Sequence, residues 1–218
     1  MKKFLNIGNL KKIFLILILL TLYIFVSAYF YVQNVSDDLA DSVFRLHIIA
    51  NSNSTEDQNL KYKVRDNVIK YMDNLCENST SKEETIKIVS NHLNDFTKIA
   101  NNTILENGFN YNATVELGNF EFPTKNYGDI SLPSGYYDAL KIKLGNSSGQ
   151  NWWCVLYPSL CFVDITQGIV PECSKQELEE SLTPEEYEII SNQNNATINF
   201  KFKLIEFFTQ NHILIAKK

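Results

Sequence analysis

The chain has 218 residues, of which 44% are hydrophobic, and its formal net charge is −5 at pH 7. This length suffices for one domain of ordinary size with a hydrophobic core, together with an N-terminal targeting segment. The mild acidity excludes a strongly basic nucleic-acid-binding protein, and the net charge gives no indication of an acidic partner either.

The N-terminal segment is uncharged and mostly apolar from residue 13 to residue 36. Lysines precede it and aspartates follow it, which places the N-terminus in the cytoplasm and the rest of the chain outside. Two interpretations stay open. Residues 13–25, followed by the small residues of Val26-Ser27-Ala28, resemble a signal peptide with its cleavage site. Alternatively, the whole apolar run to Val35 is longer than the roughly 20 residues that span a bilayer, so it could remain as a membrane anchor. We therefore predict a signal peptide or membrane anchor over residues 1–36, membrane contact through residues 13–35, and an extracytoplasmic domain over residues 37–218.

The first part of this domain predicts one strand and two helices. Apolar residues alternate along residues 43–50, as they do on one face of a strand. A polar turn at residues 51–54 suits a helix N-cap, and apolar side chains then recur at three-to-four spacing from Leu60 to Leu75. A capping-box pattern at Ser81 begins a second helix, which Gly108 ends.

The second part predicts strands at residues 111–117, 135–144 and 152–163. Residues 122–128 should form a loop, and Gly145-Asn146 a hairpin-type turn. Two short helices and a last strand complete the order: the helices begin at Ser174 and Thr183, and the strand covers residues 200–208. The sum is a single α+β domain, β-α-α-β-β-α-β, with helices packed on one face of a largely antiparallel sheet.

The cysteines suit an exported chain. They are even in number, so three complete pairings exist among Cys76, Cys154, Cys161 and Cys173. Cys154 and Cys161 flank Pro158, and a disulfide closing this loop would stabilise the fold by roughly 2–4 kcal/mol. No Cys-x-x-Cys occurs and the three histidines are dispersed, so we predict neither a metal nor a cofactor.

Both tryptophans of the chain stand side by side within residues 151–164. Large aromatic side chains dominate the energetics of cores and interfaces, so this segment should be a place of dense packing. On a strand the side chains of Trp152 and Trp153 face opposite ways. We therefore expect one tryptophan in the core and the other exposed as a partner contact.

Charged and polar residues surround the junction between the first strand and the first helix of the domain. Arg65 and Asp66 cannot both belong to the apolar stripe of that helix, so at least one of them faces solvent or a buried partner. Two interpretations apply to these residues: a solvated face with a structural ion pair, or a contact surface for a partner. The candidates at this junction are Arg45, His47, Asn51, Arg65 and Asp66.

A catalytic site is the less favoured interpretation. The chain has no Asp-Thr/Ser-Gly, Gly-x-Ser-x-Gly, HExxH or phosphate-binding glycine loop. Cys154 with His47 or His92 as base would give a thiol nucleophile. Carboxylate chemistry would have to draw on Glu56, Asp57, Asp66 and Asp164. Structural roles are commoner for residues of both kinds, so an exported thiol- or carboxylate-dependent enzyme of the cell envelope stays the alternative.

Four segments of the chain carry a family resemblance, and they occur in the family's order: residues 45–52 with their continuation at 56–66, then 122–125, 135–137 and 151–164. Together they resemble the stage II sporulation protein R family. The similarity runs from about Arg45 to Phe208 and departs from the family at Ser159, where a second proline is expected.

This resemblance implies a signalling protein without catalytic activity. Such a protein is made in the forespore and exported into the space between the two septal membranes. There it activates a membrane-embedded aspartic protease of the mother cell, which cleaves the precursor of the sigma-E factor. The resemblance also favours partner contact for Arg45, His47, Asn51, Arg65 and Asp66, beside Trp152 and Trp153.

Overall fold

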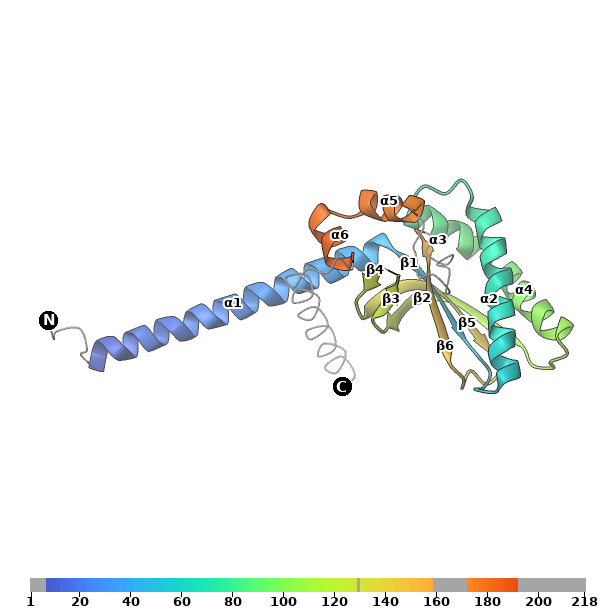
Figure 1. Ribbon diagram of the computed structural model, residues 1–218, viewed down its shortest axis with the longest axis horizontal. Coiled ribbons are helices and arrows are strands. Elements are labelled where there is room, and N and C mark those ends of the chain that lie inside the picture. Colours follow the sequence, from blue (N-terminus) through green and yellow to red (C-terminus); the bar gives the residue numbers. More distant parts are fainter. Residues whose placement is uncertain (1–6, 129, 159–171, 192–218) are drawn as a thin grey trace.

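The structure is a computed structural model that describes residues 7–128, 130–158 and 172–191. Its strands β2, β5, β1 and β6 form a mixed sheet in that order, and helices α2 to α4 lie on one face of it (Figure 1). The elements are α1 (Ile7–Ser42), β1 (Phe44–Ile49), α2 (Thr55–Cys76), α3 (Lys82–Asn91), α4 (Leu93–Glu106), β2 (Ala113–Phe122), β3 (Lys125–Tyr127), β4 (Ile130–Leu132), β5 (Gly135–Leu144), β6 (Asn151–Tyr157), α5 (Glu172–Ser181) and α6 (Pro184–Ile190). The predicted α+β class is confirmed.

Strand β1 lies in the middle of the sheet. It pairs in parallel with β5 and antiparallel with β6, while β2 pairs antiparallel with β5. The predicted turn at Gly145-Asn146 exists, but the hairpin is wrong, because β5 and β6 flank β1 instead of pairing with each other. An alternating pattern identifies a strand, whereas its neighbours depend on residues far away in the chain.

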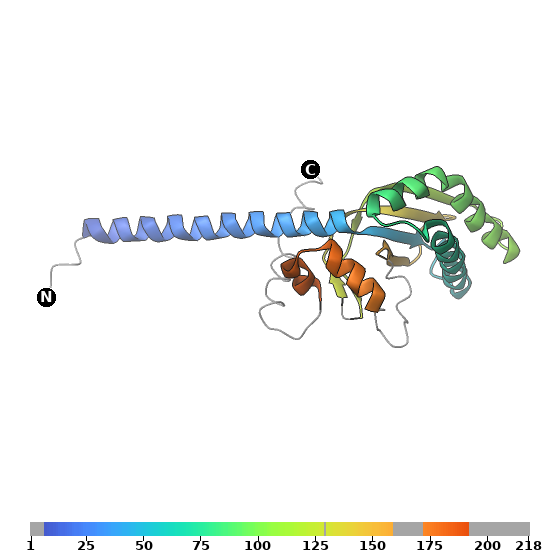
Figure 2. The same ribbon diagram turned by 90° about the horizontal axis from the view of Figure 1, so that it is seen from above.

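Helix α1 joins the apolar N-terminal segment to the domain without a break. Its apolar side chains up to residue 31 are largely exposed, and by length and composition it could cross a membrane. Its last turns are different, because Val35 and Leu39 are buried in the core. Figure 2 shows α1 projecting from the domain, with α5 and α6 beside its last turns.

The helices of the core pack as the apolar stripes predict. Leu60, Val64 and Val68 of α2 are buried, as is Phe96 of α4. The Ser54 side chain caps α2 by accepting the Asp57 N–H. The predicted single helix over residues 81–108 is wrong, because the chain leaves helical geometry at His92 (φ −117°, ψ 16°) and α3 and α4 are separate helices.

Two small elements complete the described fold. The predicted loop at residues 122–128 contains β3, which pairs with β4 in a separate two-stranded sheet, so this prediction is wrong. A capping box between Thr183 and Glu186 begins α6, as predicted. The predicted strand at residues 200–208 lies outside the described residues.

Candidate functional site

The two tryptophans of β6 lie on opposite faces of the sheet. Trp152 is paired with Ile48 of β1, whose side chain points toward the helices, and Trp153 is paired with His47. Both rings are half-buried. The expected division into one core and one exposed tryptophan therefore does not hold, because each ring is partly covered by a polar side chain.

On the helix side, Trp152 stacks with residues of α2. The guanidinium carbon of Arg65 lies 4.4 Å from the centre of the Trp152 ring system, and the Tyr62 ring meets it edge-on at 5.5 Å. Arg65 also forms an ion pair with Asp66, with 2.6 Å between Nη2 and Oδ1. We call these three residues, Tyr62, Arg65 and Trp152, the α2–β6 cluster. Tyr62 and Asp66 are exposed, so a partner can reach this cluster.

On the other side, Trp153 stacks on His47. The two ring centres are 3.6 Å apart with 18° between the planes, and Phe122 packs against both rings. His47 Nε2 lies 2.8 Å from Asn151 Oδ1, so Nε2–H donates this hydrogen bond. His47 Nδ1 is buried and has no partner within the described part of the chain.

Arg45 is completely buried beneath a small aromatic cage. Its guanidinium carbon lies 4.1 Å from the Phe122 ring centre and 4.6 Å from that of Tyr137, and Nη2 donates to the Tyr127 hydroxyl at 2.7 Å. Nε and Nη1 find no acceptor among the described residues. In this conformation Arg45 cannot touch a partner, and it holds β3 against the sheet.

Asn51 is a structural clamp at the end of β1. Its Oδ1 accepts the Asn146 N–H at 2.8 Å, and its Nδ2 donates to Asp57 Oδ2 at 2.8 Å. Asp57 also accepts hydrogen bonds from Ser52 and Tyr111. Burial raises the pKa of Asp57, but these hydrogen bonds together outweigh burial and hold it below its usual value. The candidate residues of the junction are thus divided among the α2–β6 cluster, the His47–Trp153 stack, the Arg45 cage and this clamp.

His47 is a buried base surrounded by cations. Burial lowers its pKa to about 4, and the positive charges of Lys141, Arg45 and Lys143 act in the same direction, against the hydrogen bond to Asn151. The ring is therefore neutral at pH 7. A neutral imidazole can stack closely on Trp153 without the cost of burying a charge.

His47 should make the fold sensitive to mild acid. Between pH 6.5 and pH 4 the unfolded chain binds a proton at this histidine that the folded chain does not, so stability falls as the pH falls. Lowering the pH from 7.5 to 5.0 should cost about 2 kcal/mol through His47 alone. The measurement is urea unfolding at both pH values of the chain without residues 1–28, which removes most of the apolar N-terminal segment. The wild-type protein should show this loss of unfolding free energy, and His47→Gln a smaller one. Equal losses in both proteins would contradict the assignment.

The two cysteines whose side chains the structure describes, Cys76 and Cys154, offer no reactive thiol. Cys154 is disulfide-bonded, so no thiol is available at this position. Cys76 is a free thiol, and burial, with the charges of Asp73 and Glu84, raises its pKa to about 11. Cys161 lies outside the described residues, so the Cys154–Cys161 pairing stays a prediction. No cluster that could hold a metal ion occurs among the described residues.

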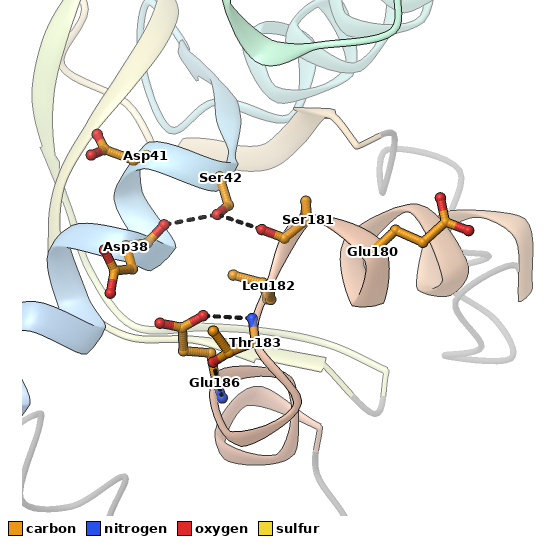
Figure 3. Close-up of a pocket in the computed structure, with 8 residues that line it drawn as sticks. All are labelled: Asp38, Asp41, Ser42, Glu180, Ser181, Leu182, Thr183 and Glu186. Atoms are coloured by element: carbon orange, nitrogen blue, oxygen red, sulfur yellow. Dashed lines mark hydrogen bonds between the residues drawn. The ribbon is translucent and has the colours of Figure 1, made fainter.

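An acidic pocket that the sequence did not indicate lies where α1 meets the turn between α5 and α6 (Figure 3). Its volume is about 420 Å³. Ser42 Oγ donates to Asp38 O at 2.8 Å and approaches Ser181 O at 3.4 Å. Burial, and then a hydrogen bond with Glu186, raise the pKa of Asp38. The pocket connects α1 to the C-terminal helices, and its lining residues are Asp38, Asp41, Ser42, Glu180, Ser181, Leu182, Thr183 and Glu186.

Comparison with known proteins places these features in a family. The sequence profile described as "Stage II sporulation protein R" matches residues 40–167, which hold all seven candidate contact residues. Stage II sporulation protein R of Bacillus subtilis (strain 168) is 42% identical over 130 residues, which are 60% of this chain and 58% of the relative. No solved structure matches the chain significantly. The profile covers more than half of the sequence, and the chain therefore belongs to the stage II sporulation protein R family.

Proposed function

We propose that this chain is an exported sporulation signal without catalytic activity, which activates a membrane-embedded aspartic protease. The protease then cleaves the precursor of the mother-cell sigma-E factor. Membership of the family supports a role in sporulation. The protease and its substrate are what the resemblance to this family implies.

The α2–β6 cluster is the observation that carries the proposal. Tryptophan, tyrosine and arginine are the residue types most enriched among interface hot spots. Here they are stacked in advance on a rigid helix and strand, so a partner would not have to order them on binding. The Trp152 indole Nε1 is also buried without an acceptor in the described part of the chain. Such a surface suits recognition of another protein.

The N-terminal helix supports export from the forespore into the space between the septal membranes. Its apolar run follows lysines and precedes aspartates, so the domain would lie outside the cytoplasm. Among the described side chains of α1, the first buried one is Val35, seven residues after Ala28. Cleavage after Ala28 would release an intact domain, and a retained helix would hold the domain at the membrane surface.

Activation requires that the signal bind the active arrangement of the protease more tightly than the inactive one. Stabilising a protease dimer is one physical way to do this. The free energy available is the difference between the two binding affinities, and a difference of about 2.7 kcal/mol shifts the equilibrium about a hundredfold.

Reconstitution in a non-sporulating bacterium tests the proposal. The full chain, the membrane-embedded aspartic protease and the sigma-E precursor are produced together, and precursor cleavage is scored on gels. We expect cleavage only when the chain is present with its export segment. A matched strain produces the chain without residues 1–28, so that the domain stays in the cytoplasm, and should show no cleavage. Absence of cleavage with all three wild-type proteins folded and in the membrane would refute the proposed function.

A further inference from the structure

The sheet has one face that the described helices leave open. Directly paired residues share a face of a sheet, so the pairing register places two rows of side chains across all four strands on this side. These eight residues are called the open face. The first row is Glu116, Lys141, His47 and Trp153, and the second is Thr114, Lys143, Ile49 and Asn151.

The open face is partly accessible. Helices α2 to α4 lie against the opposite face, and β3 and β4 lie beside the upper part of the sheet (Figure 1). Of the eight residues only His47 is buried, whereas Thr114 and Asn151 are exposed and the other five are half-buried. A partner segment could therefore contact both rows directly.

Positive charge dominates this face although the chain as a whole is acidic. Lys143 is neutralised by Glu116, with 2.6 Å between Nζ and Oε1. Lys141 has no carboxylate partner within the described residues, and its Nζ lies 4.5 Å from the Phe120 ring centre. Arg45, two residues before His47 on the same face of β1, adds a buried guanidinium beside the first row. Burial lowers the pKa of His47, and the positive charges of Lys141 and Arg45 lower it further.

We propose that the open face docks an extended acidic segment of the membrane protein that this chain activates. This inference rests on the proposed function and adds a second contact surface, on the opposite side of the sheet from the α2–β6 cluster, and the chemistry of the partner segment that it binds. A carboxylate of the partner segment would pair with Lys141 and lie within the positive potential of Arg45. Apolar side chains of the segment would pack on Trp153 and Ile49. Complementary charge of this kind raises association rates and selects partners.

Lys141 is the residue to change, because its charge serves no ion pair in the described fold. In the full-chain reconstitution, Lys141→Glu should reduce precursor cleavage at least about tenfold, as expected for like charges brought together at an interface. Lys141→Met keeps the packing over Phe120 and should lose activity less severely, whereas Lys141→Arg should keep it. The matched control is Lys70→Glu, which makes the same charge change at an exposed position of α2 and should stay within about twofold of wild type.

A photo-crosslinking residue at position 141 identifies the occupant in the same cells. A crosslink to the protease supports the proposal. A crosslink to a second copy of this chain, or to lipid alone, overturns it, as does full activity of Lys141→Glu. Failure of the wild-type chain to trigger cleavage would instead refute the proposed function, so the two failures are distinguishable.

Discussion

Gly149→Ala is expected to destabilise the domain by about 3 kcal/mol, the upper end of the usual cost of overpacking. A Cβ at this position would lie 2.2 Å from Ser52 O and 2.5 Å from Ser52 C, both of which are backbone atoms. The glycine N–H also donates to Ala50 O at 2.9 Å, so the loop cannot retreat without losing this bond. The new methyl group must therefore separate the loop from the end of β1.

Urea unfolding of the chain from Tyr29 onward measures this cost, with Gly118→Ala as the control. At Gly118 the nearest atom to an added Cβ is the tip of the Phe120 ring at 3.4 Å, which is an ordinary contact. The control should lose less than about 1 kcal/mol. If the two variants unfolded at the same urea concentration, the close approach at Gly149 would not be a constraint on the fold.

Leu39→Ala should have an effect of similar size, although Leu39 belongs to the helix that carries the apolar N-terminal segment. Its side chain is completely buried. Truncating a buried leucine costs about 2–5 kcal/mol, because the cavity left behind closes only in part. The measurement is again urea unfolding of the chain from Tyr29, which contains every buried turn of α1.

Leu105→Ala is the matched control, because Leu105 in α4 is 73% exposed. It should change the free energy of unfolding by less than about 0.5 kcal/mol. Similar stabilities of the two variants would mean that the last turns of α1 do not belong to the folding unit. The predicted boundary between residues 36 and 37 falls inside α1, between Val35 and Leu39.

Local periodicity predicted most of the elements but not their neighbours. The spacing of Leu60, Val64 and Val68 is enough to predict a helix with one buried face, and all three side chains are buried in α2. The position of β1 between β5 and β6 depends on pairing across about ninety residues or more, as between Arg45 and Ala139. Local sequence carries no information about that pairing, so it predicts a hairpin at Gly145 where the structure has a turn between strands that do not pair.

The same limit applies to the candidate site. Strand alternation correctly predicted that the two tryptophans face opposite ways. The burial of Arg45 could not be predicted, because its cage is assembled from Phe122, Tyr127 and Tyr137 on three different strands. The half-burial of Trp152 likewise depends on Arg65, which arrives from a helix far earlier in the chain. The net charge of the chain also does not reveal the positive charge of the open face, because the fold decides which charged residues lie on the same face.

The central position of β1 has a consequence for export. In the proposed export, residues 44–49 directly follow the apolar helix and would emerge first on the far side of the membrane, yet both of their pairing partners lie within residues 135–157. The sheet cannot close until those residues have crossed as well, because non-local pairing must wait for the whole intervening chain. Interrupted translocation would therefore yield an unfolded chain open to proteolysis, and under the proposed function only a completely delivered molecule could act as the messenger.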